Sequence, residues 1–266
     1  MNLKDCEIIA PSRVGAELAR MRSIRPLVQC ITNDVVQEIS ANVLLAAGMS
    51  PAMVPGEEEA ADFARFAADA LLCNVGTPKA ATVASMKAAA AAMNECGKPW
   101  SLDPVGAGGT AWRNRAISEL VDLHPTVIRG NGSEILAVAG FAHSYKGVDS
   151  MDSSASAVDA AIALAQRSQG VVCVSGETDY ITDGRRVICA KGGNVMVTLV
   201  VGTGCSLSAL AAGFAAKAED PLLSTAACCQ YVKRAAEAAG KTAKAPGSFH
   251  TAYIDALYEL RPGDFA

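Results

Sequence analysis

The sequence predicts an α/β fold with a largely parallel central sheet covered by helices on both faces. Short apolar runs rich in β-branched residues alternate along the 266 residues with longer Ala- and Leu-rich runs of helical periodicity. Polar residues and glycines follow the short runs. This alternation is typical of βαβ units, whose parallel strands are buried between layers of helices.

The short apolar runs are expected to be strands at residues 27–31, 70–75, 100–103, 126–128 and 171–175. Residues 180–188 are expected to form a hairpin, because Asp183-Gly184 at its centre favours a tight turn. The clearest helices are expected at residues 78–96, 152–168, 205–217, 221–239 and 247–260. No repeat, charge block or low-complexity linker divides the chain, so residues 1–266 are expected to form a single domain.

Composition excludes several classes of function. The formal net charge of −4 gives no general attraction to nucleic acid or to an anionic membrane. The longest uncharged apolar stretches, such as residues 205–216, are too short to span a bilayer. The first residues are partly acidic and lack an apolar segment typical of a signal peptide, which favours a cytoplasmic protein.

The nine cysteines are expected to be mostly small buried hydrophobic residues of a reduced protein. They are spread through a long chain without a Cys-x-x-Cys pair, which argues against a disulfide scaffold or a structural zinc site. Cys73, Cys173 and Cys189 lie in apolar strand-like runs, and Cys228 and Cys229 lie in a helical run.

Residues Gly202-Thr203-Gly204-Cys205 open an Ala/Leu-rich helical run and form the most informative segment. The first N–H groups of a helix have no intrahelical acceptor, and the helix dipole adds partial positive charge there. This segment is therefore a candidate anion hole for a phosphate group. A cysteine at this position is expected to have a lowered pKa and could act as a base. The alternative is a tight turn without a ligand.

Other candidates lie after the strands, because ligands of open parallel sheets collect at the carboxyl ends. Asp103 precedes Pro104 and could bind Mg²⁺ beside a phosphate, or could cap the following turn. Glu134 stands at a helix start, where a capping role is the simpler interpretation. Arg129 leaves an apolar strand and could bind a phosphate or form a buried pair with Glu134.

Two common nucleotide motifs are absent. Residues Gly106-Ala107-Gly108-Gly109 lack the Gly-x-Gly-x-x-Gly spacing of a dinucleotide site, and no Gly-x-x-x-x-Gly-Lys-Ser/Thr sequence occurs.

Six segments, in the same order along the chain, resemble the hydroxyethylthiazole kinase family. They are residues 27–33, 48–53, 103–108, 128–134, 175–180 and 202–205, and with Pro246-Gly247-Ser248-Phe249 the similarity covers nearly the whole chain. The resemblance implies a ribokinase-like fold and ATP-dependent phosphorylation of the primary alcohol of 4-methyl-5-(2-hydroxyethyl)thiazole in thiamine salvage. It also implies Mg²⁺, ATP as co-substrate and a homotrimer with active sites at subunit interfaces.

The resemblance also implies roles for individual residues. Cys205 stands at the position of the catalytic base, which is aspartate in many ribokinase-like relatives, and the backbone of residues 202–205 forms the anion hole. The remaining roles are ATP binding by Arg129 and Ser175, organisation of Mg²⁺ and phosphates by Asp103 and Glu134, and thiazole binding by Asn33, Met53 and Gly202.

Three positions depart from the pattern of the family. Gln29 stands where histidine is common, Ser175 replaces threonine, and Asn194 lies in a segment that usually reads Gly-His-Pro. Ser175 keeps the hydroxyl group. Gln29 and Asn194 leave the shape of the acceptor site open.

Alternative functions follow from the same residues. Other ribokinase-like enzymes, a hydroxymethylpyrimidine kinase or an ATP-dependent NAD(P)H-hydrate dehydratase, typically have aspartate in place of Cys205. A non-catalytic sensor of nucleotide or thiazole would not need Asp103, Glu134, Arg129 and Cys205 together. Nucleophilic catalysis by cysteine is disfavoured, because no histidine lies near Cys205 in the sequence and no Cys-x5-Arg loop occurs.

Overall fold

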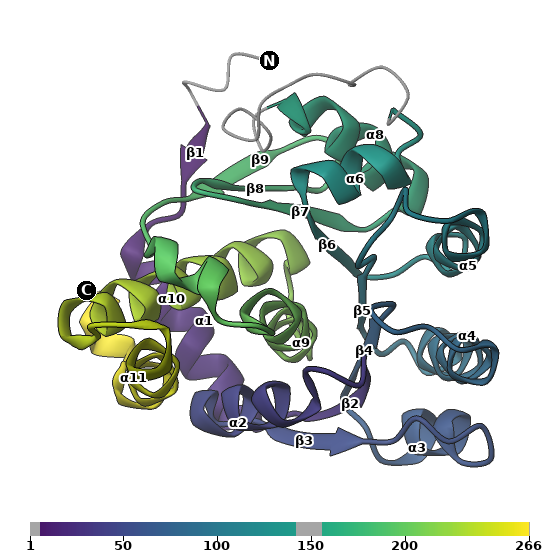
Figure 1. Cartoon of the computed structure of the whole chain (residues 1–266), viewed down its shortest axis with the longest axis horizontal. Coiled ribbons are helices and arrows are strands. Elements are labelled where there is room, and N and C mark those ends of the chain that lie inside the picture. The colour runs from purple at the N-terminus through teal and green to yellow at the C-terminus, as the bar shows by residue number, and fades with distance from the viewer. Residues whose placement is uncertain (1–5, 142–155, 266) are drawn as a thin grey trace.

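A computed structural model describes residues 6–141 and 156–265, and within them nine strands form one sheet (Figure 1). The strand order is β1-β9-β8-β7-β6-β5-β4-β2-β3, and every neighbouring pair is parallel except the pairs that involve β8. The strands are β1 (Glu7–Ile8), β2 (Leu27–Ile31), β3 (Ser50–Met53), β4 (Ala70–Asn74), β5 (Trp100–Asp103), β6 (Val127–Asn131), β7 (Val171–Ser175), β8 (Asp179–Thr182) and β9 (Val187–Ala190).

Helices cover both faces of the sheet, as predicted (Figure 1). One face carries α1 (Pro11–Ile24), α2 (Gln37–Ala47), α9 (Thr203–Ala215), α10 (Pro221–Thr242) and α11 (Pro246–Glu259). The other carries α3 (Ala60–Phe66), α4 (Ala80–Glu95), α5 (Ala111–Val121), α6 (Gly132–Val138) and α8 (Val158–Ser168). Two 3-10 helices, η2 (Val195–Leu199) and η3 (Pro262–Phe265), complete the described elements.

The strands separate two hydrophobic cores, which explains why most of their residues are apolar. In β4, Leu72 packs in the core with α9 and α10, whereas Leu71 and Cys73 pack in the core with α4. Successive side chains of a strand point to opposite faces, so a strand between two layers of helices favours apolar residues at successive positions. Pro51 lies in β3 at the edge of the sheet, where its missing N–H interrupts no central ladder.

Helix α9 is the most enclosed helix of the site, because it lies between the sheet and helices α2 and α10 (Figure 1). All residues from Ser206 to Ala215 are buried. A Cβ at Gly213 would lie 2.3 Å from Met49 Sδ, so the glycine allows α9 to pack against the segment before β3. This packing fixes the position of the N-terminus of α9.

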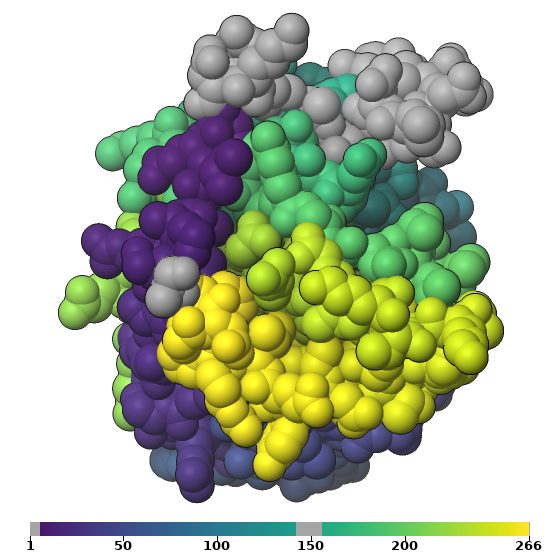
Figure 2. All heavy atoms as spheres, turned by 90° about the vertical axis from the view of Figure 1, so that its left-hand side faces the viewer, coloured from purple at the N-terminus to yellow at the C-terminus, as the bar shows by residue number. Residues whose placement is uncertain are grey.

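The C-terminal helices pack against the N-terminal part of the chain (Figure 2). Arg22 of α1 connects these segments, since its guanidinium donates to the carbonyls of Ala47, Leu257 and Leu260 at 3.0, 3.0 and 2.7 Å. No helix among the described residues is long and apolar enough to cross a membrane.

The predicted elements are present with small shifts at their ends. The helix expected from residue 205 begins at Thr203, and the strand expected at 126–128 extends to Asn131. Residues 152–155 of the helix expected at 152–168 lie outside the described residues, and the remainder contains α8. The pattern did not single out α1, α2, α3, α5, α6 or β3.

Most of the cysteines are buried, as predicted, but Cys96 is exposed, Cys205 is partly buried and one pair is not reduced. Cys73, Cys173, Cys228 and Cys229 are buried and free. Cys189 is also buried, but the structure pairs it with Cys6 in a disulfide with a Cα–Cα distance of 6.1 Å. Because β1 lies parallel to β9, with Ile8 opposite Cys189, the tertiary pairing of two strands far apart in sequence brings these sulfurs together.

Candidate active site

The candidate residues converge on the edge of the sheet where its parallel strands end. Asn74 and Asp103 end β4 and β5 in adjacent register, and Asn131 and Ser175 are adjacent at the ends of β6 and β7. The N-terminus of α9 lies at the same edge, since Gly204 approaches Arg129 of β6. The sheet topology therefore collects polar groups that are separated by more than 100 residues in sequence.

The start of α9 has the geometry of an anion-binding site. Gly202 adopts a φ of +89° immediately before the helix, and no side chain caps the first turn. The N–H groups of Thr203, Gly204 and Cys205 therefore lack intrahelical acceptors and a side-chain cap. Added to the helix dipole, these donors would stabilise a phosphate group.

Cys205 lies at this helix start, but the prediction of a lowered pKa is wrong. Burial and the nearby Asp103 carboxylate raise the pKa of the thiol. Hydrogen bonds from Asn74 and Asn33, with Asn33 Nδ2 3.6 Å from Sγ, and the charge of Arg129 act in the opposite direction but are weaker. The helix start is more enclosed than the sequence indicated, and loss of water from a thiolate outweighs these donors.

Asp103 is completely buried next to Cys205 and does not cap a turn, so that alternative is wrong. Its Oδ2 accepts hydrogen bonds from Asn74 Nδ2 and Ser208 Oγ, both at 2.8 Å, and lies 3.9 Å from Arg129 Nη1. Its Oδ1 has no hydrogen-bond partner among the described residues. Burial raises the pKa of Asp103 to about 7, although the charge of Arg129 lowers it.

Arg129 joins the two halves of the site. Its guanidinium donates to Ser175 Oγ and faces Asp103, so the alternative of a pair with Glu134 is wrong. A Cβ at Gly204 would lie 2.8 Å from Arg129 Nη1, and the glycine therefore lets the guanidinium approach the first turn of α9.

Glu134 has the capping role that its position indicated, and a second contact as well. It forms a capping box with Asn131: Asn131 N donates to Glu134 Oε2 and Glu134 N donates to Asn131 Oδ1, both at 2.9 Å. Its Oε1 also accepts from Gly106 N at 3.1 Å. Glu134 therefore holds the segment after β5 next to the start of α6.

A cavity of about 1020 Å³ opens beside Arg129. Of the predicted site residues, it is lined by Arg129, Ser175, Thr203 and Gly204. Its other walls are the segments at 176–179 and 191–198 and one face of α10. Asp103, Glu134, Cys205 and the three predicted thiazole residues do not line it. The described site thus has a large cavity on one side of the α9 start and a separate side that contains Cys205.

The predicted thiazole residues lie on the second side but are not gathered into a closed pocket. Asn33 contacts Cys205. Gly202 packs against α2, where a Cβ would lie 2.5 Å from Ile39 Cγ2. Met53 is partly buried at the end of the edge strand β3.

Of the three positions that depart from the family pattern, Gln29 and Asn194 lie in different parts of the site. Gln29 is buried and donates to the carbonyls of Val54 and Ala60 at 3.3 and 3.0 Å, so it holds the segment after Met53. Asn194 caps η2 by accepting from Met196 N at 2.9 Å and lines the large cavity. Asn194 therefore contributes to the shape of the large cavity and not to the side of the site that contains Asn33.

Sequence reasoning missed two features of the site. Asn74 connects Asn33 to Asp103, because its Oδ1 accepts from Asn33 Nδ2 at 2.9 Å while its Nδ2 donates to Asp103. Its position at the end of an apolar strand was the available signal. The second feature is a buried ion pair of Asp179 and Lys233 at 3.2 Å, which no sequence signal indicated because 54 residues separate the partners.

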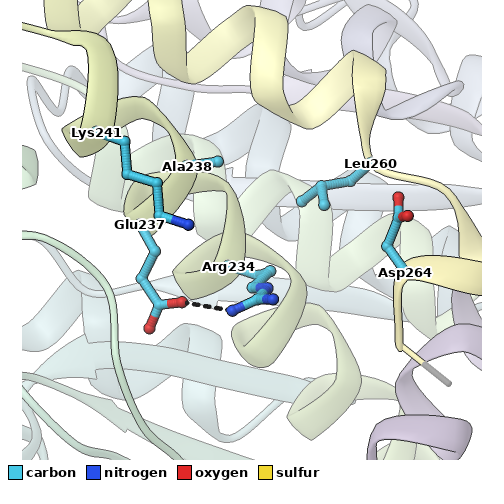
Figure 3. Close-up of a pocket in the computed structure, with 6 residues that line it drawn as sticks. All are labelled: Arg234, Glu237, Ala238, Lys241, Leu260 and Asp264. Carbon is cyan, nitrogen blue, oxygen red and sulfur yellow. Dashed lines mark hydrogen bonds and ion pairs between the residues drawn. The ribbon is translucent and has the colours of Figure 1, made fainter.

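A second, smaller hollow of about 270 Å³ lies between α10 and the C-terminal segment (Figure 3). Its charges are of both signs, and Arg234 pairs with Glu237 at 3.2 Å across one helical turn. It contains none of the predicted site residues.

Comparison with known proteins shows the family of the chain. The model of the hydroxyethylthiazole kinase family matches residues 18–263. The chain is 48% identical over 258 residues to the hydroxyethylthiazole kinase of Serratia proteamaculans, covering 97% of each, and 50% identical over 253 residues to that of Klebsiella pneumoniae, covering 95% of this chain and 98% of the relative.

Solved structures give the same result. The hydroxyethylthiazole kinase protein of Pyrococcus horikoshii superposes with a TM-score of 0.86 at 38% identity, covering 93% of each chain. A ribokinase-like superfamily protein of Enterococcus faecalis shares the fold alone, with a TM-score of 0.66 at 15% identity over 98% of this chain and 96% of its own. A family model and relatives that span nearly the whole chain establish that it belongs to the hydroxyethylthiazole kinase family.

Proposed function

We propose that this chain transfers the γ-phosphoryl group of ATP to the primary alcohol of 4-methyl-5-(2-hydroxyethyl)thiazole. The observation that carries the proposal is the joint position of Cys205, Arg129 and the uncapped start of α9 between a large cavity and the Asn33 side of the site. Nucleotide and alcohol would approach the helix start from opposite sides.

ATP would occupy the cavity, with its phosphates toward the α9 N-terminus. Arg129 would bind phosphate oxygens there, and Ser175, which accepts a hydrogen bond from Arg129, would orient the guanidinium and contact the nucleotide. The N–H groups of residues 203–205 would stabilise the charge that spreads over the transferring group.

Cys205 would accept the proton of the attacking hydroxyl. Only its thiolate can do so, and the raised pKa keeps most of the sulfur protonated at neutral pH. A loose transition state for phosphoryl transfer needs the proton to leave only late, so a base that is rarely ionised is sufficient. Asn33 and Asn74 donate toward the sulfur and would hold it in place.

Asp103 and Glu134 fit a Mg²⁺ site. Asp103 has a buried oxygen without a hydrogen-bond partner, and both residues supply the hard carboxylate ligands that Mg²⁺ prefers. When bound together with ATP, Mg²⁺ supplies neutralisation of phosphate charge. Ser208 and Asn74 would fix the orientation of the Asp103 carboxylate.

The proposal includes a homotrimer with active sites at subunit interfaces, formed by single-domain chains of residues 1–266 in the cytoplasm. Its support is a group of exposed apolar side chains near the start of α9: Val195, Leu199 and Val201 are 78%, 64% and 66% exposed in and after η2, and Val35 beside α2 is 63% exposed. A neighbouring subunit that covered Val35 and Val201 would also enclose Gly202, which follows Val201 and packs against Val36.

One assay tests the function. Purified protein is incubated with MgATP and hydroxyethylthiazole, and ADP release is compared with reactions that contain hydroxymethylpyrimidine or no acceptor. We expect release that depends on the thiazole, and release with hydroxymethylpyrimidine alone would favour another ribokinase-like activity.

A further inference from the structure

One face of α10 contacts two walls of the large cavity. Gln230, Lys233, Glu237 and Gly240 follow each other at spacings of three and four residues, so they lie along one side of the helix. We call these four residues the α10 stripe. It contacts the segment at 176–179, which joins β7 to β8, and the segment at 191–194, which follows β9.

Lys233 binds the first wall of the cavity, the segment at 176–179. Its ammonium donates to the carbonyls of Gly176 and Glu177 at 3.0 and 2.9 Å and lies 3.2 Å from Asp179 Oδ1. All three donors of the ammonium therefore have acceptors. Asp179 Oδ1 in turn accepts from Gly176 N at 2.9 Å, so the pair closes the turn from both of its ends.

This ion pair is enclosed by protein. The side chains of Lys233 and Asp179 are only 8% and 5% exposed. Burial raises the pKa of Asp179, and the charge of Lys233 acts against that shift. Removing one partner would leave the other buried without its counter-charge, which is far more unfavourable than the loss of a surface pair.

The other residues of the α10 stripe contact the second wall of the cavity, the segment at 191–194. Gln230 binds Lys191 at both backbone groups, accepting from its N at 3.2 Å and donating to its O at 3.0 Å. Glu237 Oε1 accepts from Gly193 N at 3.2 Å. Gly240 leaves room for the Asn194 side chain, because a Cβ there would lie 2.0 Å from Asn194 Nδ2.

We propose that the α10 stripe, through the Asp179–Lys233 ion pair above all, positions the two walls of the nucleotide cavity and thereby sets the affinity for ATP. The inference rests on the proposed function only in placing ATP in this cavity. Lys233 and Asp179 act as positioning residues, since the three acceptors of the ammonium are protein groups. Fixing the walls before binding avoids the entropy of ordering them on the nucleotide.

The test measures nucleotide affinity separately from acceptor affinity. In Lys233→Met and Asp179→Asn, we expect the KM for ATP and the calorimetric Kd for MgADP to rise about tenfold, with the KM for hydroxyethylthiazole within about twofold of the parent value. The double variant should resemble either single variant, because each breaks the same contact. General destabilisation would instead lower the active fraction and kcat and leave both KM values unchanged.

Two further variants make the result decisive. Lys241→Met removes a cation from the same helix at the hollow in Figure 3 and should leave the Kd for MgADP unchanged. Gln230→Ala removes the hydrogen bonds to the backbone of Lys191 without leaving a buried charge, so we expect it to fold even if the ion-pair variants do not, and it should weaken MgADP binding about threefold.

Arg129→Met separates this inference from the proposed function. If Arg129→Met weakens MgADP binding while Lys233→Met and Gln230→Ala bind as the parent does, the positioning role is overturned and the nucleotide site remains. If Arg129→Met has no effect on MgADP binding, the placement of ATP itself is wrong.

Discussion

Cys205 and Asp103 illustrate how single residues in this site depend on their surroundings. A cysteine at a helix start is expected to ionise easily, yet burial and the neighbouring carboxylate raise its pKa. Burial likewise raises the pKa of Asp103 to about 7. Burial therefore favours the neutral form of both groups, and of the two only Asp103 has a pKa close to neutral pH.

Replacing Cys205 tests its role as base. Cys205→Ala should lower kcat about 100-fold, the lower range for loss of a general base, with little change in the KM for thiazole. Cys205→Asp should keep substantial turnover, because aspartate supplies a base at the same position. Steady-state kinetics measure both, and Cys96→Ala, at an exposed cysteine at the end of α4, is the control. Equal kcat values for the parent and Cys205→Ala would remove Cys205 from the mechanism.

The pKa of Asp103 makes a prediction for stability. The folded state binds a proton at Asp103 more tightly than the unfolded state, with a pKa of about 7 against 3.8. Stability without Mg²⁺ should therefore fall as the pH rises from about 4 to 7, by up to about 4 kcal/mol. Asp103→Asn does not titrate, so its urea stability relative to the parent in EDTA should increase from pH 5 to pH 8. If the stabilities of the parent and Asp103→Asn changed with pH in parallel, the pKa of Asp103 would not be raised by folding.

At the scale of elements, the start of α9 depends on how closely α2 approaches it. The apolar periodicity predicted the helix, and the Gly-x-Gly sequence predicted its open first turn. The contact of Gly202 with Ile39 and Val36 was not predictable, because it depends on the packing of two helices more than 150 residues apart. Strands β2, β4, β5 and β7 were predictable because burial on both faces leaves a mostly apolar run, whereas β3, with Pro51, was not.

Gly202→Ala tests this contact. The alanine would need a φ of +89° and its Cβ would lie 2.5 Å from Ile39 Cγ2, so we expect a loss of more than about 1 kcal/mol of stability and a lower kcat. Gly97→Ala is the matched control: its φ of +63° is also positive, but no described atom lies within 4 Å of the added Cβ. It should lose about 1 kcal/mol and keep its kcat. Equal losses of stability in Gly202→Ala and Gly97→Ala would mean that α2 shifts to accommodate the added methyl group.

At the scale of the whole molecule, exposed apolar residues gather on one side, beside α2 and α11. Strand β1 lies at one edge, and β3, which ends at Met53, lies at the other. The exposed apolar residues around η2 and Val35 lie on the side of α2 and α11, because η2 contacts α11 and α11 contacts α2. Association of subunits through this side would cover them.

Charged substitutions test the proposed trimer. Leu199→Lys combined with Val201→Lys should convert trimers to smaller species in sedimentation equilibrium and lower kcat/KM for thiazole, since a lysine is costly to bury at an interface. Ile8→Lys, at a residue 55% exposed on β1, is the control and should leave both properties unchanged. A trimer that persists in the double variant would place the interface elsewhere.

The sequence by itself determined the α/β class, the order of the main strands and helices, and most of the polar groups of the site, because hydrophobic periodicity and glycine-rich strand exits are local signals. Only the tertiary structure decided that Asp103 is buried against Arg129, that Cys205 resists ionisation, that Cys6 meets Cys189 and that Lys233 reaches Asp179. These features depend on desolvation and on contacts between segments far apart in the chain, and neither is contained in the local pattern of residues.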